Sequence, residues 1–379
     1  MRIPLAAPDI HEEDIEAVIR VLRTPTLSLG PKLKEFEHSV AEYVGGLHAV
    51  AVSSGTSGLH LCIRTLHIGE GDEVIVPSFA FVAVANAVRY ERAIPVFVDI
   101  DPETLNLDPG SIEAAITPRT RAVLAVHTFG RPAELSAILD IARRHHLFVI
   151  EDACEAIGAE YAGRKVGGMG ELGVFAFYPN KQMTTGEGGV MVTGDPEIAE
   201  LARKLRNQGR SDGAGWLQHS ELGYNYRISD INCALGIEQL KRIESVLARR
   251  EAIAGEYDRR LAGHPGLKLP RLSMPRCRIS WFAYVVRLGD PLAQFHRDWI
   301  LQQMTARGIE CGRYFAPIHL QPIYQSASGY RTALPATERN AVRSLALPFF
   351  NRIEEWQMEE VCQTLRELID QALELEPGG

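Results

Sequence analysis

Residues 121–152, RAVLAVHTFGRPAELSAILDIARRHHLFVIED, carry the pattern that decides the fold. Two β-rich apolar runs, RAVLAVH and LFVIED, enclose a segment with apolar residues at helical spacing: Leu135, Ile138, Leu139 and Ala142. Nearly continuous apolar strands separated by helices are typical of a mainly parallel sheet with helices on both faces. This stretch therefore predicts an α/β fold.

The same alternation continues on both sides of this stretch, from about residue 47 to 210. Four more β-rich runs lie between helix-like or loop segments: AVAVSS, DEVIVPS, IPVFVDI and GVFAFY. The chain has 379 residues, 46% of them hydrophobic, which is enough for about two or three domains of ordinary size. We expect the alternating part to form a large α/β domain, residues 1–240, which includes an N-terminal arm.

A different pattern follows the alternating part. A long helix is expected from near Asp230 to about Leu261, with Ser229 or Asp230 as its N-terminal cap. Beyond it, proline-rich loops surround one further strand candidate, SWFAYVVRL, and helical patterns return twice towards the end of the sequence. These features predict a smaller α+β domain over residues 241–379, entered by the long helix.

Charge and cysteine content argue against several classes of function. The formal net charge is −8 and no long Lys/Arg cluster appears, which disfavours nucleic acid and anionic membranes as partners. The first residues lack the apolar core of a signal peptide, and no window has the length and apolarity of a membrane helix. Six widely spaced cysteines without a C-x-x-C pair predict reduced, mostly buried thiols in a cytoplasmic protein, and no metal site.

Ligands of an open α/β sheet bind outside the carboxyl ends of its strands, so the residues that follow the strands are candidate site residues. Gly55-Thr56-Ser57-Gly58 follows the first predicted strand and precedes an apolar helix. Such a turn presents backbone N–H groups at a helix N-terminus to an anion, most often phosphate. The same residue types are also common in strand-to-helix turns that bind nothing, so this turn alone decides nothing.

Two further strand ends carry charged residues. Glu151 and Asp152 end the run LFVIED, where a carboxylate needs a cation or several N–H donors. A salt bridge or a helix cap is the alternative role for such a carboxylate. Lys181 follows the run FAFY in FAFYPNKQMTTGEGGV, residues 175–190. A desolvated lysine can act as a nucleophilic amine, although a single loop lysine is more often a solvated surface residue.

The three features together are more specific than each alone. Pyridoxal phosphate (PLP) needs N–H donors for its phosphate, an acidic partner for its ring nitrogen and an amine for its aldehyde. An anion-binding turn, a carboxylate and a lysine at neighbouring strand ends meet these needs. The sequence therefore predicts a site for PLP.

With these residues in place, the chain resembles the DegT/DnrJ-type sugar aminotransferases, which are PLP-dependent enzymes of fold type I. Six strings occur in the family's order: SSGTSGLHL, VPSFAFVAVANAV, VIEDACEAIGA, FYPNKQMTTGEGG, GYNYRISDINCALG and PIHLQPIY. The resemblance covers most of the chain, from TLSLGPKLKEFE to SLALPFF. It implies a large domain with a mainly parallel sheet of the seven-stranded type, covered by helices, and a smaller α+β C-terminal domain.

The resemblance implies two catalytic residues. Lys181 matches the lysine that binds the cofactor aldehyde and then moves a proton during the reaction. Asp152 matches the partner of the pyridine nitrogen, which keeps the ring an electron sink. Gly55, Thr56 and Ser57 match the turn that binds the phosphate of PLP, or of its amino form PMP.

Further contacts are implied by the same resemblance. Phe81 matches the aromatic residue that stacks on the ring, Glu155 lies where the family has a side chain near the ring hydroxyl, and Asn225 matches a residue that reaches the phosphate of a neighbouring subunit. Family members are dimers with shared active sites, so a homodimer is expected. Four residues lie in motifs that tend to line the substrate pocket: Tyr178, Arg227, Tyr314 and His319.

Two residues depart from the family pattern. Many relatives carry Ser at the position of Ala176, where its hydroxyl binds the phosphate. Because this donor is absent here, we expect the backbone turn or Asn180 to carry more of the phosphate contact. Many relatives also have Thr at the position of Ala80, so the loop that bears Phe81 is expected to be arranged differently.

The resemblance implies transfer of an amino group from glutamate to the keto group of a nucleotide-linked sugar, with a 4-keto-6-deoxy sugar favoured. The product would enter amino-sugar or polysaccharide synthesis. A PLP-dependent sugar dehydratase is an alternative, but the known dehydratases of the family have histidine at the position of Lys181. An aminocyclitol-type ketone is an alternative substrate.

Two other classes of function are disfavoured. A nicotinamide-dependent oxidoreductase is disfavoured because SSGTSG lacks the G-x-G-x-x-G spacing. A non-catalytic PLP-binding module is disfavoured by the Lys181/Asp152 pair.

Overall fold

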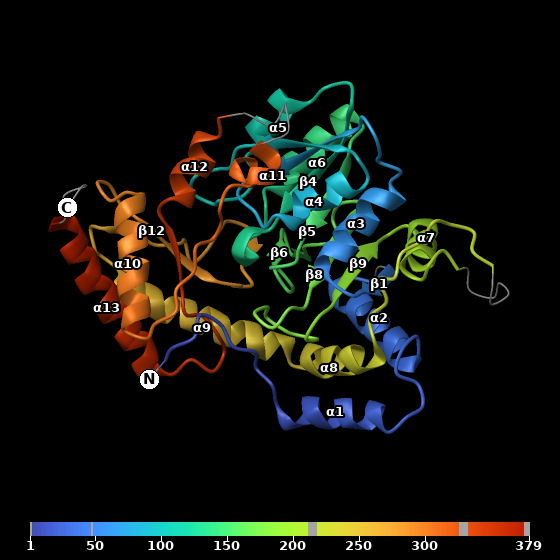
Figure 1. Cartoon of the computed structure of the whole chain (residues 1–379), viewed down its shortest axis with the longest axis horizontal. Coiled ribbons are helices and arrows are strands. Elements are labelled where there is room, and N and C mark those ends of the chain that lie inside the picture. The colour runs from blue at the N-terminus through green and yellow to red at the C-terminus, as the bar shows by residue number, and fades with distance from the viewer. Residues whose placement is uncertain (1, 47, 211–217, 326–332, 375–379) are drawn as a thin grey trace.

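A seven-stranded sheet forms the centre of the larger part of the computed structural model, which describes residues 2–46, 48–210, 218–325 and 333–374 (Figure 1). In spatial order its strands are β1 (His48–Val52), β9 (Gly189–Thr193), β8 (Leu172–Ala176), β5 (Phe148–Asp152), β4 (Thr120–Val126), β2 (Glu73–Pro77) and β3 (Ile94–Val98). Strand β9 is antiparallel to both of its neighbours, and the other pairs are parallel. The predicted mainly parallel sheet is therefore confirmed.

Helices cover both faces of this sheet. One face carries α3 (Gly55–Thr65), α4 (Ala83–Tyr90) and α7 (Pro196–Arg206). The other face carries α2 (Pro31–Val44), α5 (Pro109–Ala115), α6 (Leu135–His145) and α8 (Asp230–Lys241). The stretch 121–152 supplies most of β4, then α6 and β5, in the predicted order of strand, helix and strand.

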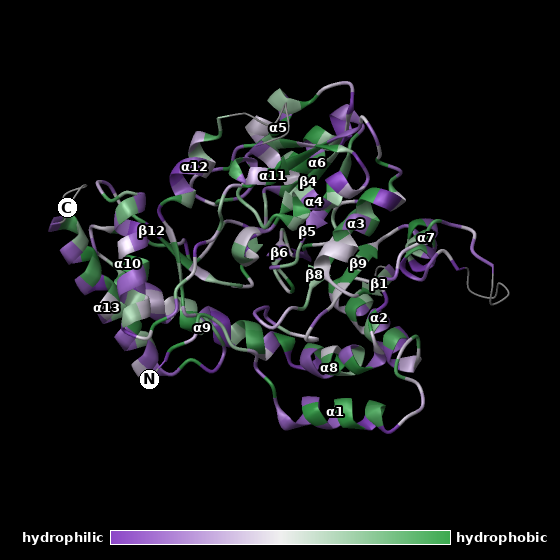
Figure 2. Ribbon diagram, viewed as in Figure 1, coloured by the Kyte–Doolittle hydropathy of each residue, from purple (hydrophilic) through white to green (hydrophobic). Residues whose placement is uncertain are grey.

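A second, three-stranded antiparallel sheet lies in the C-terminal part. Its order is β10 (Leu267–Lys268), β12 (Tyr284–Leu288) and β13 (Ser344–Leu347), and β12 lies within the predicted strand SWFAYVVRL. Helices α9 (Ile243–Leu261), α10 (Gln294–Ala306) and α13 (Glu355–Glu374) share its hydrophobic core. Hydrophilic and hydrophobic residues alternate along α13 (Figure 2), as in a surface helix with one buried side. The division of the chain at residues 240/241 stays a prediction.

Short elements complete both parts of the molecule and connect them. They are the 3-10 helices η1 (Thr128–Gly130) and η2 (Ile318–Leu320), the helices α11 (Pro322–Gln325) and α12 (Pro335–Ala341), and the strands β6 (Glu160–Tyr161), β7 (Arg164–Lys165) and β11 (Cys277–Arg278). Strand β11 pairs with β6, so a segment that follows α9 extends a hairpin of the larger part.

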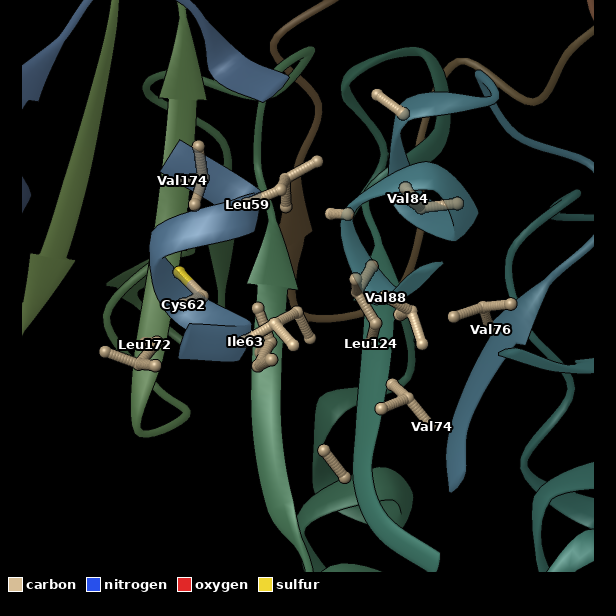
Figure 3. Close-up of a cluster of buried hydrophobic side chains, with 14 of the residues drawn as sticks. Leu59, Cys62, Ile63, Val74, Val76, Val84, Val88, Leu124, Leu172 and Val174 are labelled. Carbon is tan, nitrogen blue, oxygen red and sulfur yellow. The ribbon is translucent and has the colours of Figure 1, made fainter. Parts of the chain in front are cut away.

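The central sheet is apolar on both sides because both sides are buried. In β2, Val74 and Val76 lie in the core under α3 and α4, whereas Ile75 between them lies in the core under α5 and α6. This alternation follows from the two-residue period of a strand. Figure 3 shows the first of these cores, in which Cys62 and Ile63 of α3 lie over the strands.

The predicted long helix is two helices rather than one. Helix α8 ends at Lys241 and α9 begins at Ile243, because the backbone of Arg242 leaves helical values (φ −110°, ψ 11°). The Arg242 guanidinium binds the Asp14 carboxylate, with N–O distances of 2.6 and 2.8 Å. This contact with a residue 228 positions earlier cannot be seen in a local helix pattern.

The cap of α8 agrees with one of the two predicted residues. Ser229 is the cap, since its hydroxyl accepts a hydrogen bond from the Asn232 N–H at 3.2 Å. Asp230 instead accepts hydrogen bonds from the backbone N–H groups of Gly30 (2.8 Å) and Lys32 (3.0 Å) at the start of α2. The carboxylate thus caps a different helix from the one that it begins.

The N-terminal arm contacts both parts of the molecule. Ile3 lies in the C-terminal core, and its N–H donates to the Gly308 carbonyl at 2.8 Å. Helix α1 (Glu12–Leu22) packs on α8 through Ala17 and Val21. The arm therefore ties the start of the chain to residues that the predicted division assigns to the smaller domain.

All six cysteines are described and are free thiols. Three are buried and three are half-buried, so the predicted burial holds fully for half of them: Cys62, Cys233 and Cys362. Among the described helices, none is both long enough and apolar enough to cross a bilayer.

Candidate active site

One pocket of about 410 Å³ lies at the carboxyl ends of β5 and β8, beside the N-terminus of α3. Nine of the predicted site residues line it: Gly55, Thr56, Phe81, Asp152, Glu155, Tyr178, Asn180, Lys181 and Tyr314. They come from five separate segments of the chain. The topology of the sheet therefore brings together residues that are up to 259 positions apart (314 − 55) in the sequence.

The N-terminus of α3 forms one side of the pocket. The Ser54 hydroxyl caps the helix by accepting a hydrogen bond from the Ser57 N–H at 3.1 Å. The first N–H groups of a helix have no acceptors within the helix, and Gly55 and Thr56 at this end line the pocket. The Ser57 side chain instead bonds the Ser53 and Ser54 hydroxyls, at 3.0 and 2.9 Å. The Ser57 side chain thus stabilises the turn through hydrogen bonds to neighbouring side chains of the same turn.

The surroundings of Gly55 leave no room for a side chain at this position. A Cβ atom at this position would lie 2.7 Å from the Ala176 Cβ and 2.9 Å from the Cys154 sulfur. Both distances are shorter than real Cβ contacts. The backbone of the turn therefore sits directly on the ends of the neighbouring strands, at the edge of the pocket.

Strand β5 ends in two carboxylates that face opposite sides. The Asp152 side chain lines the pocket, and its Oδ1 accepts a hydrogen bond from the Cys154 N–H at 3.0 Å. Glu151 is fully buried on the other side. The side chains of these two consecutive strand residues thus point to opposite faces of the sheet.

Glu151 is surrounded by hydrogen-bond donors. Its oxygens accept from the backbone N–H groups of Gly167 (2.7 Å), Met169 (2.6 Å) and Gly170 (2.7 Å), and from His127 Nε2 (3.0 Å). Burial alone would raise the pKa of Glu151, but the hydrogen bonds from His127 and the backbone outweigh it and lower the pKa. His127 Nδ1 accepts from the Ala133 N–H, so Nε2 carries the proton.

Lys181 reaches the pocket from the loop after β8. Its Nζ lies 3.6 Å from Glu155 Oε1 and 4.1 Å from the centre of the Phe282 ring. The loop is fixed at its base, where the Phe177 carbonyl accepts from the Thr185 N–H and from the Thr184 hydroxyl, both at 3.0 Å. Lys181 is therefore largely buried, between a carboxylate and an aromatic face.

The two carboxylate oxygens of Glu155 have different partners: Oε1 faces Lys181, and Oε2 faces a backbone donor. Its Oε2 accepts from the Phe129 N–H at 3.0 Å, and its own carbonyl accepts from Gln182 Nε2 at 2.6 Å. Burial raises the pKa of Glu155, and the charge of Lys181 opposes this shift. The carboxylate and the amine thus form a close pair inside the pocket.

Two aromatic residues at the mouth are open to solvent. Phe81 is 63% exposed and Tyr178 is 51% exposed, although both line the pocket. Large apolar side chains that are exposed at a pocket commonly contact a ligand or a partner. Phe81 follows β2, in the segment where Ala80 is buried in the core under α3 and α4.

Besides Ser57, three further predicted residues do not line this pocket. His319 is buried elsewhere, with Nδ1 2.6 Å from the Ser78 hydroxyl and Nε2 3.3 Å from Glu338. Arg227 donates to Asn207 Oδ1 at 3.1 Å. Asn225 is exposed and forms a backbone bridge with Asn207. The structure of one chain thus places these side chains away from Lys181.

The pocket also contains residues that the sequence did not single out. Phe282 and Phe315 form an aromatic wall, and Cys154 and Glu187 lie near Asp152 and the turn after Lys181. Phe282 belongs to the predicted strand SWFAYVVRL, and its aromatic character was the only local signal. Its place beside Lys181 depends on how the C-terminal sheet packs.

Comparison with known proteins identifies the family. The family model that is described as the DegT/DnrJ/EryC1/StrS aminotransferase family matches residues 8–366. The chain belongs to this family. The aminotransferase is 40% identical over 371 residues to GDP-perosamine synthase of Caulobacter vibrioides, covering 97% of this chain and 98% of that protein. It is 36% identical over 378 residues to the spore coat polysaccharide biosynthesis protein SpsC of Bacillus subtilis, covering 97% of each.

Solved structures agree with this assignment. The aminotransferase superposes on DesV of S. venezuelae, solved in complex with a ketimine intermediate, with a TM-score of 0.90 and 38% identity over 97% of this chain and 99% of that one. It also superposes on Spr1654 of Streptococcus pneumoniae, solved in PLP and PMP forms, with TM-scores of 0.94 and 0.95 and 25% identity over 98–99% of this chain and 99–100% of that one. The protein is a PLP-dependent aminotransferase with the fold-type-I architecture.

The residues of the pocket fit this cofactor. The N-terminus of α3 borders the pocket, and its first N–H groups, which have no acceptor within the helix, suit a phosphate. A carboxylate, Asp152, and an amine, Lys181, line the same pocket. These are the three kinds of group that PLP needs.

Proposed function

We propose that the aminotransferase transfers an amino group from glutamate to the keto group of a nucleotide-linked sugar, with a 4-keto-6-deoxyhexose as the favoured substrate. The observation that carries this proposal is the meeting of Lys181, Asp152 and the Gly55-Thr56 turn in one pocket. It is supported by the 40% identity with a GDP-perosamine synthase over nearly the whole chain. Amino-sugar and polysaccharide synthesis is the proposed pathway class, supported by the similarity to SpsC.

Each residue has a distinct proposed role. When bound, PLP supplies a carbonyl for amines and a ring that withdraws electrons from the bonds of the amine-bearing carbon. The N–H groups of Gly55 and Thr56 would hold its phosphate, Asp152 its ring nitrogen and Lys181 its aldehyde. Phe81 would cover the ring, because it lines the pocket with most of its surface free.

Lys181 is also the proposed proton carrier of the reaction. Its Nζ lies 3.6 Å from Glu155 Oε1, an ion-pair distance at which the carboxylate stabilises the protonated amine. The Phe282 ring below Nζ keeps water from that side. Lysine at this position is what separates the proposed transamination from the dehydratase alternative, in which the family has histidine.

A spectroscopic experiment tests this function. Protein loaded with PLP is expected to absorb in the visible, and glutamate is expected to bleach the band. Addition of a nucleotide-linked keto sugar should restore it, and NMR of the product should show an amine at the former keto carbon. Loss of the band in Lys181→Ala is the expected control, and a Lys181→Ala variant with full activity would contradict the assignment.

We further propose that the enzyme works as a homodimer with shared active sites. Apolar side chains are exposed along α1, with Ile15 at 43%, Ile19 at 39% and Leu22 at 55% exposure, and their spacing places them on one side of the helix. The exposed Asn225 supports a role towards a second subunit. Light scattering after gel filtration tests the stoichiometry, and a monomer with full activity would contradict it.

A further inference from the structure

Gln182, the residue directly after Lys181, is buried and bonded to two other segments of the chain. Its Nε2 donates to the Glu155 carbonyl at 2.6 Å, and to the carbonyl and hydroxyl oxygens of Ser280 at 3.2 and 3.0 Å. Because a carbonyl oxygen can only accept, the amide nitrogen rather than the amide oxygen lies at this point. The side chain of Gln182 thus joins the turn after β5 to the segment that precedes β12.

The same two segments are also joined through η1. The Phe129 N–H donates to Glu155 Oε2 at 3.0 Å, and the Phe129 carbonyl accepts from the Phe282 N–H at 3.2 Å. The bonds of the glutamine side chain and those of η1 therefore close a ring. Glu155, η1 and residues 280–282 thus form one hydrogen-bonded frame.

The frame is closely packed. The Gly130 carbonyl accepts from the Ser280 N–H at 3.0 Å, and a Cβ atom at Gly130 would lie only 2.8 Å from the Trp281 nitrogen. From α9, the buried Arg250 donates to the carbonyls of Trp281 (2.6 Å) and Phe282 (2.7 Å). The backbone that carries the Phe282 ring is therefore held on two sides.

The frame carries both groups that flank the amine of Lys181. Nζ lies 3.6 Å from Glu155 Oε1 and 4.1 Å from the centre of the Phe282 ring. Gln182 is the sequence neighbour of Lys181, and its amide bonds the two segments from which these groups come. The side chain that enters the frame therefore belongs to the same loop as the amine that the frame surrounds.

We infer that Gln182 is a positioning residue for Lys181: it fastens the lysine loop to the frame and so holds Nζ between the Glu155 carboxylate and the Phe282 ring. This inference rests on the proposed role of Lys181 as the amine that binds the cofactor aldehyde and carries the proton. Both tasks need a fixed amine, because a displacement of about 1 Å can slow a reaction about 100-fold. The phosphate would bind at the N-terminus of α3, which is a different segment, so loss of Gln182 should leave that contact in place.

Binding of two forms of the cofactor to the cofactor-free protein is the first test. PLP can bond to Lys181, whereas PMP carries an amine in place of the aldehyde and cannot. Gln182→Met keeps the length of the side chain but removes its donor. In this variant, the rate at which PLP generates the visible band is expected to fall about 10-fold or more, whereas the dissociation constant of PMP should stay within about threefold of the wild-type value.

Rapid-mixing kinetics of bleaching by glutamate is the second test, because single-turnover measurements separate binding from chemistry. In Gln182→Met, the rate constant at saturating glutamate should fall about 10-fold or more, with little change in the glutamate concentration that gives half of it. Deuterium on the amine-bearing carbon of glutamate should slow the variant by a larger factor than the wild type, because proton transfer becomes more rate-limiting. Loss of folded protein alone would lower the amplitude of bleaching and leave the rate constant unchanged.

Two further variants serve as comparisons. Ser280→Ala removes one of the three acceptors, and it should lower both rates by about 2- to 5-fold; it decides the question if Gln182→Met does not fold. Gln239→Met is the matched control, because Gln239 is also buried and its Nε2 donates to the Asp9 carbonyl (2.9 Å) and to Asp14 Oδ2 (2.8 Å). Gln239 does not line the pocket, so this variant should lose stability without a change in either rate.

Several results would overturn the inference. These are wild-type rate constants in both Gln182→Met and Ser280→Ala, equal losses of rate in Gln182→Met and Gln239→Met, or a loss of PMP affinity as large as the loss in the reaction with PLP. The last result would assign Gln182 to the shape of the whole pocket rather than to the amine. A wild type in which PLP generates no visible band would refute the proposed role of Lys181 instead.

Discussion

Glu151 and Asp152 are neighbours in the sequence and have the same chemical group, but they end up in opposite surroundings. Glu151 is saturated by donors on the closed side of β5. Asp152 lines the open pocket and receives one backbone N–H, from Cys154. A carboxylate that is fully bonded to the protein serves the fold, and one with capacity left serves a ligand. The two residues form a matched pair in which stability and catalysis can be separated.

Removing the charge on the pocket side is expected to have the largest effect. Asp152→Asn should lower kcat by about 10²- to 10³-fold, because an amide lacks the charge that keeps the cofactor ring protonated. The midpoint of thermal unfolding of the cofactor-free protein should stay close to that of the wild type. The kcat and the thermal midpoint are measured on the same protein preparation. An Asp152→Asn variant with full activity would show that Asp152 is not a catalytic residue.

Removing the carboxylate on the closed side should affect stability instead. Glu151→Ala is expected to destabilise the protein by about 3 kcal/mol, because three backbone N–H groups and His127 lose a buried charged acceptor. The fall in the thermal midpoint of the cofactor-free protein measures this. If instead the midpoint holds and activity disappears, the division of roles between the two carboxylates is wrong.

Acid should reveal the same contribution of Glu151. Its pKa is lowered from the ordinary 4.5 in the folded protein, so its stabilising effect is fully present above about pH 4.5. The effect is lost as the pH falls from there through the lower folded pKa. The difference in thermal midpoint between the wild type and Glu151→Gln should therefore shrink below pH 4.5. A difference that grows in acid would contradict this sign.

The smallest change concerns the phosphate side of the pocket. Ala176→Ser restores the hydroxyl that many relatives carry, next to the tightly packed Gly55. We expect PLP to bind about 2- to 10-fold more tightly, the size of one added hydrogen bond. Titration of the cofactor-free protein measures it, and an unchanged affinity would show that the backbone turn already holds the phosphate fully.

The contrast also explains what the sequence could predict. Strand ends are local features, and the carboxyl ends of neighbouring parallel strands meet at one edge, so Lys181, Asp152 and the Gly55-Thr56 turn could be found from short motifs. The sheet was also predictable, because the alternation of strands and helices is a local feature of the sequence as well. What the pattern left open was which of two adjacent carboxylates faces the pocket, since this depends on the register of β5.

Features made by distant segments were not predictable in this way. Phe282 and Phe315 reach the pocket that contains Lys181 through the packing of the C-terminal part on the large sheet, and no spacing rule connects them with it. At the break between α8 and α9, Arg242 binds Asp14 of the N-terminal arm, which lies 228 positions earlier in the sequence. His319 lies in a motif of the expected pocket, but its ring is taken by Ser78 and Glu338.

The attachment of the arm has a consequence for the order of folding. Leu5 donates its N–H to Glu310, 305 residues later, and accepts a bond from the Phe349 N–H. During translation, Leu5 leaves the ribosome roughly 300 residues before these partners exist, at a synthesis rate of about 5–20 residues per second. The arm therefore stays unattached for tens of seconds while the large sheet assembles. Leu5, Asn180 and Tyr314 line a small void of about 10 Å³ beside the pocket, so closure of this void is among the final events in the maturation of the active site.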